Sequence, residues 1–244
     1  MSVDMNNCLE GFAMQLKNAV VFITGANRGL GLAFARAALA AGAAKVYAAA
    51  RDPASVTLPG VVPVALDVTD PVQVAAAAAQ CTDVTLLINN AGVSQPSSTQ
   101  APDAIAAARR SFDTNFFGLW SLSQAFAPVL KANGGGAVLN VLSALSWVTL
   151  PGTAGYSASK AAAWALSNGL RAELREQGTQ VTSLHVGYMD TDMTRGVEAP
   201  KSSPDAVARQ ALEELQAGAF EVLADDVSRQ VKASLSSATP AYAG

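Results

Sequence analysis

The chain alternates short apolar runs with longer segments whose apolar positions recur at helical spacing. Seven runs have the length and composition of strands: Ala19–Thr24, Lys45–Ala50, Val61–Leu66, Val84–Asn89, Ala137–Leu142, Val181–His185 and Phe220–Leu223. The segments between them predict helices at Gly29–Ala40, Pro71–Gln80, Ala104–Lys131 in two pieces, Tyr156–Gln177 and Pro204–Ala217. Most of these strands are continuously apolar, which is typical of a parallel sheet covered on both faces. The alternation therefore predicts an α/β Rossmann fold, a doubly wound parallel sheet of seven strands with helices on both faces.

One domain accounts for a chain of 244 residues, because hydrophobic cores stop growing at about 250–300 residues. Half of the residues are hydrophobic and 14% are charged, against roughly 25% charged in an average soluble domain, so ample apolar surface is available to bury. We expect the domain to span residues 16–236, between a flexible leader at 1–15 and a flexible tail at 237–244.

Charge and residue types exclude several classes of function. The formal net charge is -3 and no lysine or arginine run occurs, so nucleic acid is not an expected partner. Cys8, Cys81 and the single histidine, His185, provide neither a disulfide framework nor metal-ligand spacing. The uncharged stretch between Lys131 and Lys160 contains glycines and polar residues that break a membrane-spanning helix. The start of the chain lacks the basic residues of a signal peptide, so we expect a cytoplasmic protein with no metal and no membrane partner.

A glycine-rich turn directly follows the first expected strand and opens the first expected helix. It reads Thr24-Gly25-Ala26-Asn27-Arg28-Gly29-Leu30-Gly31. Glycine clusters also form plain turns, but one placed between a strand and a helix lets backbone amides and the helix dipole meet a pyrophosphate. We therefore expect a dinucleotide to contact Gly25, Asn27, Arg28, Gly29, Leu30 and Gly31.

The end of the second strand indicates which dinucleotide binds. An acidic residue here usually binds the ribose 2′-hydroxyl of NAD, whereas a cation accommodates the 2′-phosphate of NADP. The sequence places Arg51 directly after Ala50, and Arg28 lies in the glycine turn, so two guanidinium groups can meet a phosphate. Asp52 is the alternative, since a shift of one residue makes it the ribose acid. The pattern favours NADP(H).

Tyr156 and Lys160 are four residues apart, so they share one face of the expected helix. A nearby ammonium favours the phenolate and lowers the pKa of a tyrosine toward neutral pH, which suits a general acid or base. Ser143 follows the fifth expected strand, at the carboxyl edge of the sheet where open α/β folds bind ligands. An ordinary amphipathic pair has the same spacing, but the position of Ser143 favours a catalytic set.

Together these motifs resemble those of the short-chain dehydrogenase/reductase family, in its compact oxidoreductase branch. The resemblance runs from Thr24 to about Thr191. It rests on the glycine turn, Asp67-Val68, Asn89-Asn90-Ala91-Gly92, Asn115, Ser143, Tyr156-Ser157-Ala158-Ser159-Lys160, and the segment from Gly187 to Thr191. It implies an NADP(H)-dependent enzyme that interconverts a ketone or aldehyde and an alcohol by hydride transfer. The alternatives are the same chemistry with NAD(H), or a dinucleotide-binding sensor or scaffold without turnover.

The resemblance also implies a role for each matched residue. Tyr156 would protonate a carbonyl oxygen as hydride arrives, and Ser143 would hydrogen-bond the same oxygen. Lys160 would bind the nicotinamide ribose and lower the pKa of Tyr156, while Asn115 would hold a water that continues the proton path. Further cofactor contacts would come from Asp67, Val68, Asn89, Asn90, Ala91, Gly92, Gly187, Met189 and Thr191. Asn89 and Asn90 could instead satisfy backbone groups in a turn.

Two features depart from the family pattern. The loop after the sixth strand usually reads Pro-Gly and here reads Val186-Gly187, so the backbone that proline sets must be held otherwise. The family's glycine-rich ending is replaced by the last strand, an acidic turn at Asp225 and Asp226, and a helix to Leu235. His185, beside the altered loop, is more typical of a structural histidine.

The substrate pocket is expected to be mostly apolar. Its candidate wall consists of Ser94, Gln95, Leu145, Trp147, Pro151, Tyr188 and Met193. An apolar ketone or aldehyde fits such a wall best. Arg195 or Lys201 could instead recognise an acid group.

Missing charge predicts a homodimer. No charged residue lies between Asp113 and Lys131, nor in 161–170 of the helix that follows Tyr156. A helix without a charged stripe is usually buried on both sides, so Phe117 and Trp120 of the first helix would form a large apolar patch on a monomer. The resemblance implies that the two helices pair with their copies across a two-fold axis. A tetramer remains an alternative.

Overall fold

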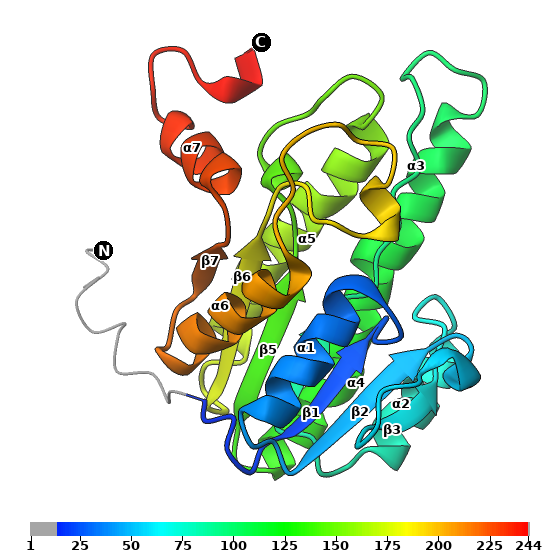
Figure 1. The fold of residues 1–244 in the computed structure, drawn as a ribbon, viewed down its shortest axis with the longest axis vertical. Helices are drawn as coiled ribbons and strands as arrows, with labels where there is room; N and C mark the ends of the chain where they lie inside the picture. The colour runs from blue at the N-terminus through cyan, green and yellow to red at the C-terminus, as the bar shows by residue number, and fades with distance from the viewer. Residues whose placement is uncertain (1–13, 244) are drawn as a thin grey trace.

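The computed structural model describes residues 14–243, and seven parallel strands form one sheet within them (Figure 1). The strands are β1 (Val20–Thr24), β2 (Lys45–Ala50), β3 (Val62–Ala65), β4 (Leu86–Asn89), β5 (Gly136–Val141), β6 (Thr179–His185) and β7 (Glu221–Leu223). Their order is β3-β2-β1-β4-β5-β6-β7, which confirms the doubly wound parallel sheet. The order reverses between β1 and β4, and open α/β folds bind ligands beyond the carboxyl ends of strands at such a point.

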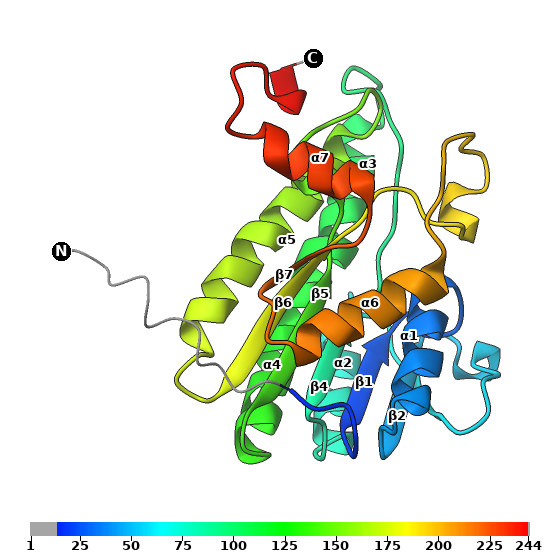
Figure 2. The same ribbon diagram turned by 60° about the vertical axis from the view of Figure 1, so that its left-hand side comes forward.

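Helices cover both faces of the sheet, as the sequence predicts (Figure 2). They are α1 (Gly29–Ala40), α2 (Pro71–Gln80), α3 (Ala104–Phe112), α4 (Leu119–Ala132), α5 (Ala154–Glu173), α6 (Pro204–Gln216) and α7 (Asp226–Ser234). α1 and α6 pack on one face, whereas α2, α4 and α5 pack on the other. The start of α2 shows how the sequence sets such an end, because Asp70 caps it by accepting from Val72 N at 2.9 Å, with Pro71 in the first turn.

A π-helical turn, Asp113–Gly118, joins α3 to α4 and explains why this long helix is in two pieces. Such a turn adds one residue to the helical register and is common at functional sites. Gly118 closes it against Val68, since a Cβ atom on Gly118 would lie 2.8 Å from Val68 Cγ2.

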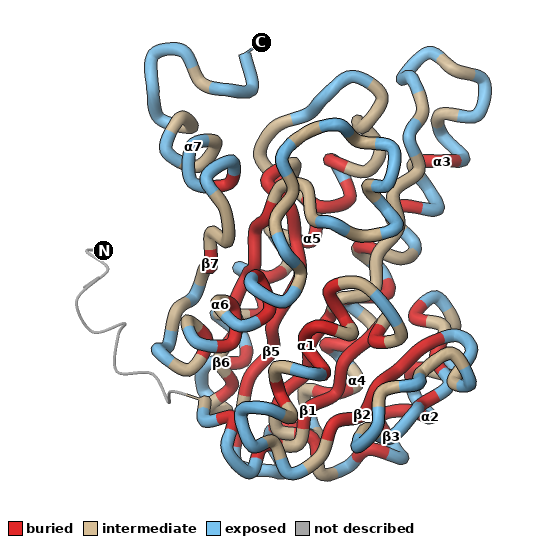
Figure 3. Tube along the Cα trace, viewed as in Figure 1, coloured by how far each residue is buried: buried red, intermediate tan, exposed pale blue. Residues whose placement is uncertain are grey.

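The buried residues concentrate in the sheet and on the inner sides of the helices, while α7 and the loops above the sheet are largely exposed (Figure 3). The expected leader at 1–15 lies mostly outside the described residues. After α7 the chain forms a short 3-10 turn, Ala241–Ala243, held to the helix by a bond from Ala241 N to Ser234 Oγ at 3.1 Å. No helix in residues 14–243 has both the length and the apolar character needed to cross a membrane.

Candidate active site

The glycine turn joins β1 to α1 in a backbone conformation that favours glycine. Gly25 and Gly29 have φ angles of +64° and +54°. A Cβ atom on Gly31 would lie 2.1 Å from the Gly25 carbonyl oxygen, so no larger residue fits there. No side chain caps the first amides of α1, and free amides at a helix start bind anions. The turn thus supplies the donor set that the pyrophosphate of a dinucleotide requires.

Asn90 ties the end of β4 to the end of β1. Its Nδ2 donates to the carbonyl oxygens of Thr24 at 2.8 Å and Gly25 at 3.2 Å. Thr24 Oγ1 accepts from the backbone amides of Asn90 at 3.0 Å and Ala91 at 2.9 Å. The Asn90 side chain therefore holds the glycine turn in place, which is the backbone role that the sequence left open.

Asn89 is buried and also bonds within the protein. Its Nδ2 donates to Asn140 Oδ1 at 2.9 Å and to Ser123 Oγ at 3.1 Å. Asn140 in turn donates to Ser167 Oγ at 2.9 Å, so a polar chain links β4 and β5 to α4 and α5. Both amide side chains of 89–92 thus bond within the protein, and cofactor contacts by this segment stay a prediction.

Ser143 and Tyr156 meet at the carboxyl edge of the sheet. Ser143 follows β5, and its Oγ accepts from Leu145 N at 3.1 Å, which caps the 3-10 turn Ala144–Ser146. Tyr156 lies in the first turn of α5. Burial raises the pKa of its phenol above the usual value, and a hydrogen bond with Ser143 acts in the opposite direction. The two hydroxyl groups are therefore close enough to act on one substrate oxygen.

Lys160 lies one turn further along α5 and is buried, with 4% of its surface exposed. Its Nζ donates to the Val141 carbonyl oxygen at 2.8 Å and lies 5.9 Å from the centroid of the Tyr156 ring. Burial lowers the pKa of this ammonium to about 8. The effect of Lys160 on the pKa of Tyr156 stays a prediction, and burial of the phenol acts against it.

Asn115 lies in the π-helical turn, and its side chain bonds to the segment that follows β4. Its Oδ1 accepts from Val93 N at 2.9 Å, and its Nδ2 donates to the Val93 carbonyl oxygen at 2.9 Å and to Ser159 Oγ at 3.0 Å. A Cβ atom on Gly92 would lie 3.2 Å from Asn115 Oδ1 and 3.7 Å from Lys160 Nζ, so these groups meet around Gly92. The structure thus brings Asn115, Ser143, Tyr156 and Lys160 to one edge.

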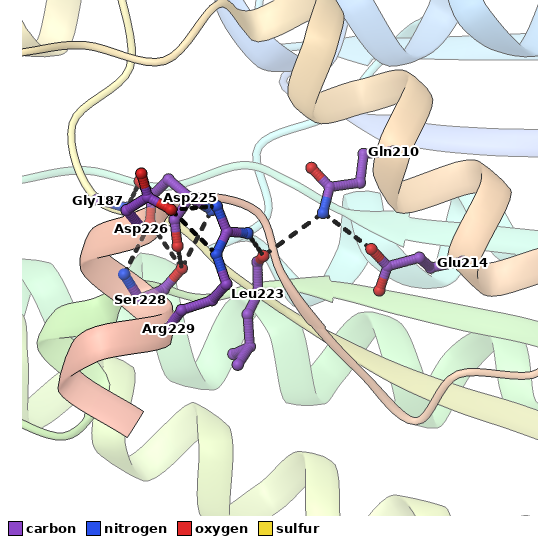
Figure 4. Close-up of polar contacts among 8 residues, drawn as sticks. All are labelled: Gly187, Gln210, Glu214, Leu223, Asp225, Asp226, Ser228 and Arg229. Atoms are coloured by element: carbon purple, nitrogen blue, oxygen red, sulfur yellow. Dashed lines mark hydrogen bonds and ion pairs between the residues drawn. The ribbon is translucent and has the colours of Figure 1, made fainter. Parts of the chain in front are cut away.

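The loop after β6 is held by the C-terminal helix. Gly187 N donates to Asp225 Oδ2 at 2.7 Å, and Asp225 Oδ1 caps α7 by accepting from Ser228 N at 2.8 Å (Figure 4). A Cβ atom on Gly187 would lie 2.9 Å from Asp225 Oδ2, so a larger residue here would displace that carboxylate. The residue that caps α7 therefore restrains the backbone at Val186-Gly187, where the family usually has a proline.

Met189 and Thr191 continue this loop over the glycine turn. The Met189 carbonyl oxygen accepts from Thr191 N at 2.9 Å and also from Thr194 Oγ1. A Cβ atom on Gly29 would lie 3.4 Å from Thr191 Cγ2, so the loop reaches the start of α1. Thr191 therefore lies beside the start of α1, and its contact with a cofactor stays a prediction.

The expected phosphate-binding residues lie at the ends of β1 and β2. Arg51 is exposed directly after β2, whereas Asp52 Oδ1 accepts from Ala54 N at 3.0 Å and caps the turn Pro53–Ser55. Arg28 is exposed too, and its Nη1 lies 3.2 Å from Asp192 Oδ2. In this structure Arg28 thus points to the loop after β6, and Arg51 is the cation available at the strand end.

Four other predicted positions lie on this side. Asn27 Nδ2 donates to Ser55 Oγ at 3.1 Å, and Leu30 is buried under the turn. Asp67 Oδ1 accepts from Thr69 N at 2.9 Å and Thr69 Oγ1 at 2.7 Å, and Val68 is buried. Asp67 therefore shapes its own turn after β3.

One member of the expected substrate wall and one possible acid anchor have other contacts. The Trp147 ring stacks on His185 with centroids 3.8 Å apart, so it faces the protein and not an open pocket. Arg195, a possible anchor for an acid group, is paired with Asp192.

Two contributors to the site, Ser159 and Asp225, were not identified from the sequence. Neither carries a local signal, since a serine inside a helix and an aspartate before one are common.

A family model described as short chain dehydrogenase matches residues 19–202, which is more than half of the chain. The chain belongs to the short-chain dehydrogenase family. This match confirms the resemblance that the motifs carry.

Several short-chain dehydrogenases are similar along most of this chain. A solved structure of a short chain dehydrogenase from Burkholderia cenocepacia in complex with NADP is 41% identical, with a TM-score of 0.88, and covers 92% of this chain and 95% of its own. The 3alpha-hydroxysteroid dehydrogenase of Mediterraneibacter gnavus is 32% identical over 238 residues, 89% of this chain and 94% of that protein. Dehydrogenase/reductase SDR family member 7B of Bos taurus is 35% identical over 199 residues, which are 73% of this chain. The chain spans 60% of the length of that relative.

Proposed function

We propose that the protein is an NADP(H)-dependent oxidoreductase that interconverts a ketone or aldehyde and an alcohol. The observation that carries this proposal is the meeting of Ser143, Tyr156 and Lys160 at the sheet edge, beside the glycine turn and Asn115. Assays of the purified protein with NADPH and a panel of apolar ketones and aldehydes test it. Absence of turnover across the panel, with NADPH bound, would favour a sensor instead.

The residues at this edge fit a nicotinamide dinucleotide. The amides of Gly29, Leu30 and Gly31 have no side-chain cap and would hold its pyrophosphate. Lys160 would hold the nicotinamide ribose, and Thr191 would reach the nicotinamide end. When bound, the reduced cofactor supplies the hydride for carbonyl reduction.

The chain's own side chains handle the oxygen and the proton. Ser143 donates a hydrogen bond to the substrate oxygen, and Tyr156 gives that oxygen its proton. Because the charge grows on this oxygen during the reaction, donors fixed beforehand stabilise the transition state. Lys160 and Asn115 continue the proton path from Tyr156, since both polar groups lie around Gly92. The same groups take the proton back in alcohol oxidation.

Two observations support NADP(H) over NAD(H). Arg51 is exposed at the end of β2, while the carboxylate of Asp52 is engaged in capping its own turn. A carboxylate occupied in this way is poorly placed for a ribose hydroxyl, and a guanidinium suits a phosphate. The relative from Burkholderia cenocepacia, 41% identical, was solved in complex with NADP.

Replacing Arg51 with alanine should weaken NADPH binding at least about tenfold and leave NADH binding nearly unchanged, because a charge-assisted contact of about 1.5–3 kcal/mol is lost. Titration of cofactor fluorescence measures both affinities. The exposed Arg209 of α6 provides the control, since Arg209→Ala removes the same charge elsewhere. An equal loss for both cofactors in Arg51→Ala would contradict the assignment.

We also propose a homodimer built on α4 and α5. Phe117 and Trp120 are 52% and 45% exposed, and both rings contact Phe116, at 4.9 and 5.5 Å between centroids. This aromatic patch lies on the helix that lacks charge, which supports its burial against a second copy. A tetramer would need a further contact surface, and cytoplasmic location stays a prediction from sequence.

Trp120→Glu should convert the dimer to a monomer at micromolar concentration, because a carboxylate in the middle of an apolar interface is strongly unfavourable. Sedimentation or light scattering gives the mass, to be compared with 24.9 kDa for one chain. Val72 of α2 is 75% exposed, so Val72→Glu places the same charge outside the proposed interface and should keep the dimer. A monomeric wild-type protein would rule out the proposal.

A further inference from the structure

A buried cluster lies behind Ser143 and is not used by the proposed chemistry. His185, the single histidine of the sequence, ends β6 and is fully buried. Its Nδ1 lies 3.0 Å from the Ser143 carbonyl oxygen. Its ring stacks on Trp147, with an interplanar angle of 16°. The first contact is made to Ser143 itself, and Trp147 lies at the other end of the 3-10 turn Ala144–Ser146 that Ser143 caps.

The contact with Ser143 determines the tautomer of His185. A carbonyl oxygen only accepts hydrogen bonds, so Nδ1 must carry the proton. Burial lowers the pKa of the ring to about 3, with Lys232, Lys160 and Arg171 acting in the same direction, so the ring is neutral at pH 7. Nε2 then has a lone pair, and it finds no hydrogen-bond donor within residues 14–243. Its nearest charged neighbour, Glu221 Oε1, lies 3.7 Å away.

The C-terminal helix covers the other side of this cluster. Lys232 Nζ of α7 lies 4.9 Å from the centroid of the Trp147 ring, within the range of a cation–π contact. The same ammonium pairs with Glu221 Oε2 at 2.8 Å, which fixes it to β7. α7 is therefore anchored at its end by Lys232 and at its start by Asp225 on Gly187.

We propose that His185 is a positioning residue for Ser143, and that Lys232 of α7 keeps His185 in place through Trp147. The proposal rests on the role proposed for Ser143. A serine hydroxyl at the end of a strand is free to move if its peptide unit rotates. Two backbone bonds already hold this peptide unit: Ser146 N donates to the Ser143 carbonyl oxygen at 3.0 Å, and Ala144 N donates to the Val186 carbonyl oxygen at 3.0 Å. The bond from His185 Nδ1 adds a third restraint on the carbonyl oxygen, and the bond from Leu145 N orients Oγ.

The tautomer can be observed directly, because the sequence has one histidine. The protein is labelled with ¹⁵N-histidine and carries no histidine tag. Its nitrogen NMR spectrum should show a proton on Nδ1 of His185 and none on Nε2, unchanged from pH 6 to 8. In Trp147→Leu or Lys232→Met the Nδ1 proton should exchange faster with water. A wild-type protein with no proton on Nδ1 would overturn the proposal whether or not the protein is an enzyme.

Kinetics separate positioning from folding. His185→Phe keeps the stacked ring and removes the donor, and it should lower kcat at least about tenfold with little change in the KM for NADPH, as small misplacements do. His185→Asn places an amide nitrogen near the position of Nδ1 and should recover most of that loss. A role in folding alone predicts instead that kcat follows the folded fraction in both variants.

The pH profile of alcohol oxidation provides a second reading. The hydrogen bond from Ser143 lowers the pKa of Tyr156, so a displaced Ser143 should move the rising limb to higher pH in His185→Phe. Ser143→Ala is measured beside it: a low kcat there supports the proposed function. If Ser143→Ala is impaired while His185→Phe matches wild type in kcat and limb, the positioning role alone is overturned.

Lys232→Met tests the contribution of α7. It should shift the limb in the same direction as His185→Phe and lower kcat by about threefold, a smaller effect because the histidine is still present. Gln230 is exposed on the same helix, and Gln230→Met should behave as wild type. Equal behaviour of the two variants would remove Lys232 from the proposal.

Discussion

Tyr156→Phe is expected to lower kcat for carbonyl reduction by about 10²–10⁴-fold, the range typical of a lost general acid. The ring and its packing on α5 stay, so the protein should fold and bind NADPH as wild type does. Only the hydroxyl that meets Ser143 is removed. Single-turnover measurements with saturating NADPH isolate this step from cofactor binding.

The control for this variant is Tyr242→Phe, which removes a hydroxyl from an exposed tyrosine after α7. It should keep full activity. Turnover of Tyr156→Phe within a few-fold of wild type would mean that another group donates the proton, and would remove Tyr156 from the proposed mechanism.

Lys160→Met should abolish most turnover, again by about 10²-fold or more, because the proton path and the ribose contact are both lost. It should nevertheless unfold at the same temperature as wild type at pH 7, or at a higher one. The folded protein lowers the pKa of this ammonium from 10.5 to about 8, so keeping it charged opposes folding by about 3 kcal/mol at neutral pH. The bond to the Val141 carbonyl oxygen offsets part of that gain.

The pH dependence identifies the cause. The unfolded chain binds the extra proton between about pH 8 and 10.5, so this group makes the free energy of unfolding rise with pH in that window. The stability difference between Lys160→Met and wild type should therefore shrink toward pH 10. Lys17→Met, at an exposed lysine, should show no such trend. A variant much less stable than wild type at pH 7 would contradict this account of Lys160.

The sheet and its helices were predictable because each carries a strong local signal. The run Lys45–Ala50 is a strand in the structure with the same ends, and the helix Gly29–Ala40 likewise. The ends of both elements lie at turns that the sequence predicts. Glycine positions were equally informative, since Gly31 faces backbone that only glycine allows.

Contacts between distant segments were not predictable. The bond from Gly187 N to Asp225 joins residues 38 apart, and nothing near either residue indicates its partner. Burial of the Tyr156 phenol, which raises its pKa, was not predictable for a related reason, because spacing along a helix places an ammonium nearby but gives no measure of burial. Arg28 was expected at a phosphate, and its contact with Asp192 depends on a loop path that the sequence does not define.

The π-helical turn at Asp113–Gly118 sets the rotation of α4 about its own axis. One residue rotates a helix by about 100°, so the extra residue decides which side chains of α4 meet the sheet. As built, Leu122 and Phe126 are buried and Trp120 is turned outward. Loss of a single residue from this turn would bring that outer side toward the core. The turn that holds Asn115 therefore also determines which side of α4 is exposed, the side on which the dimer is proposed.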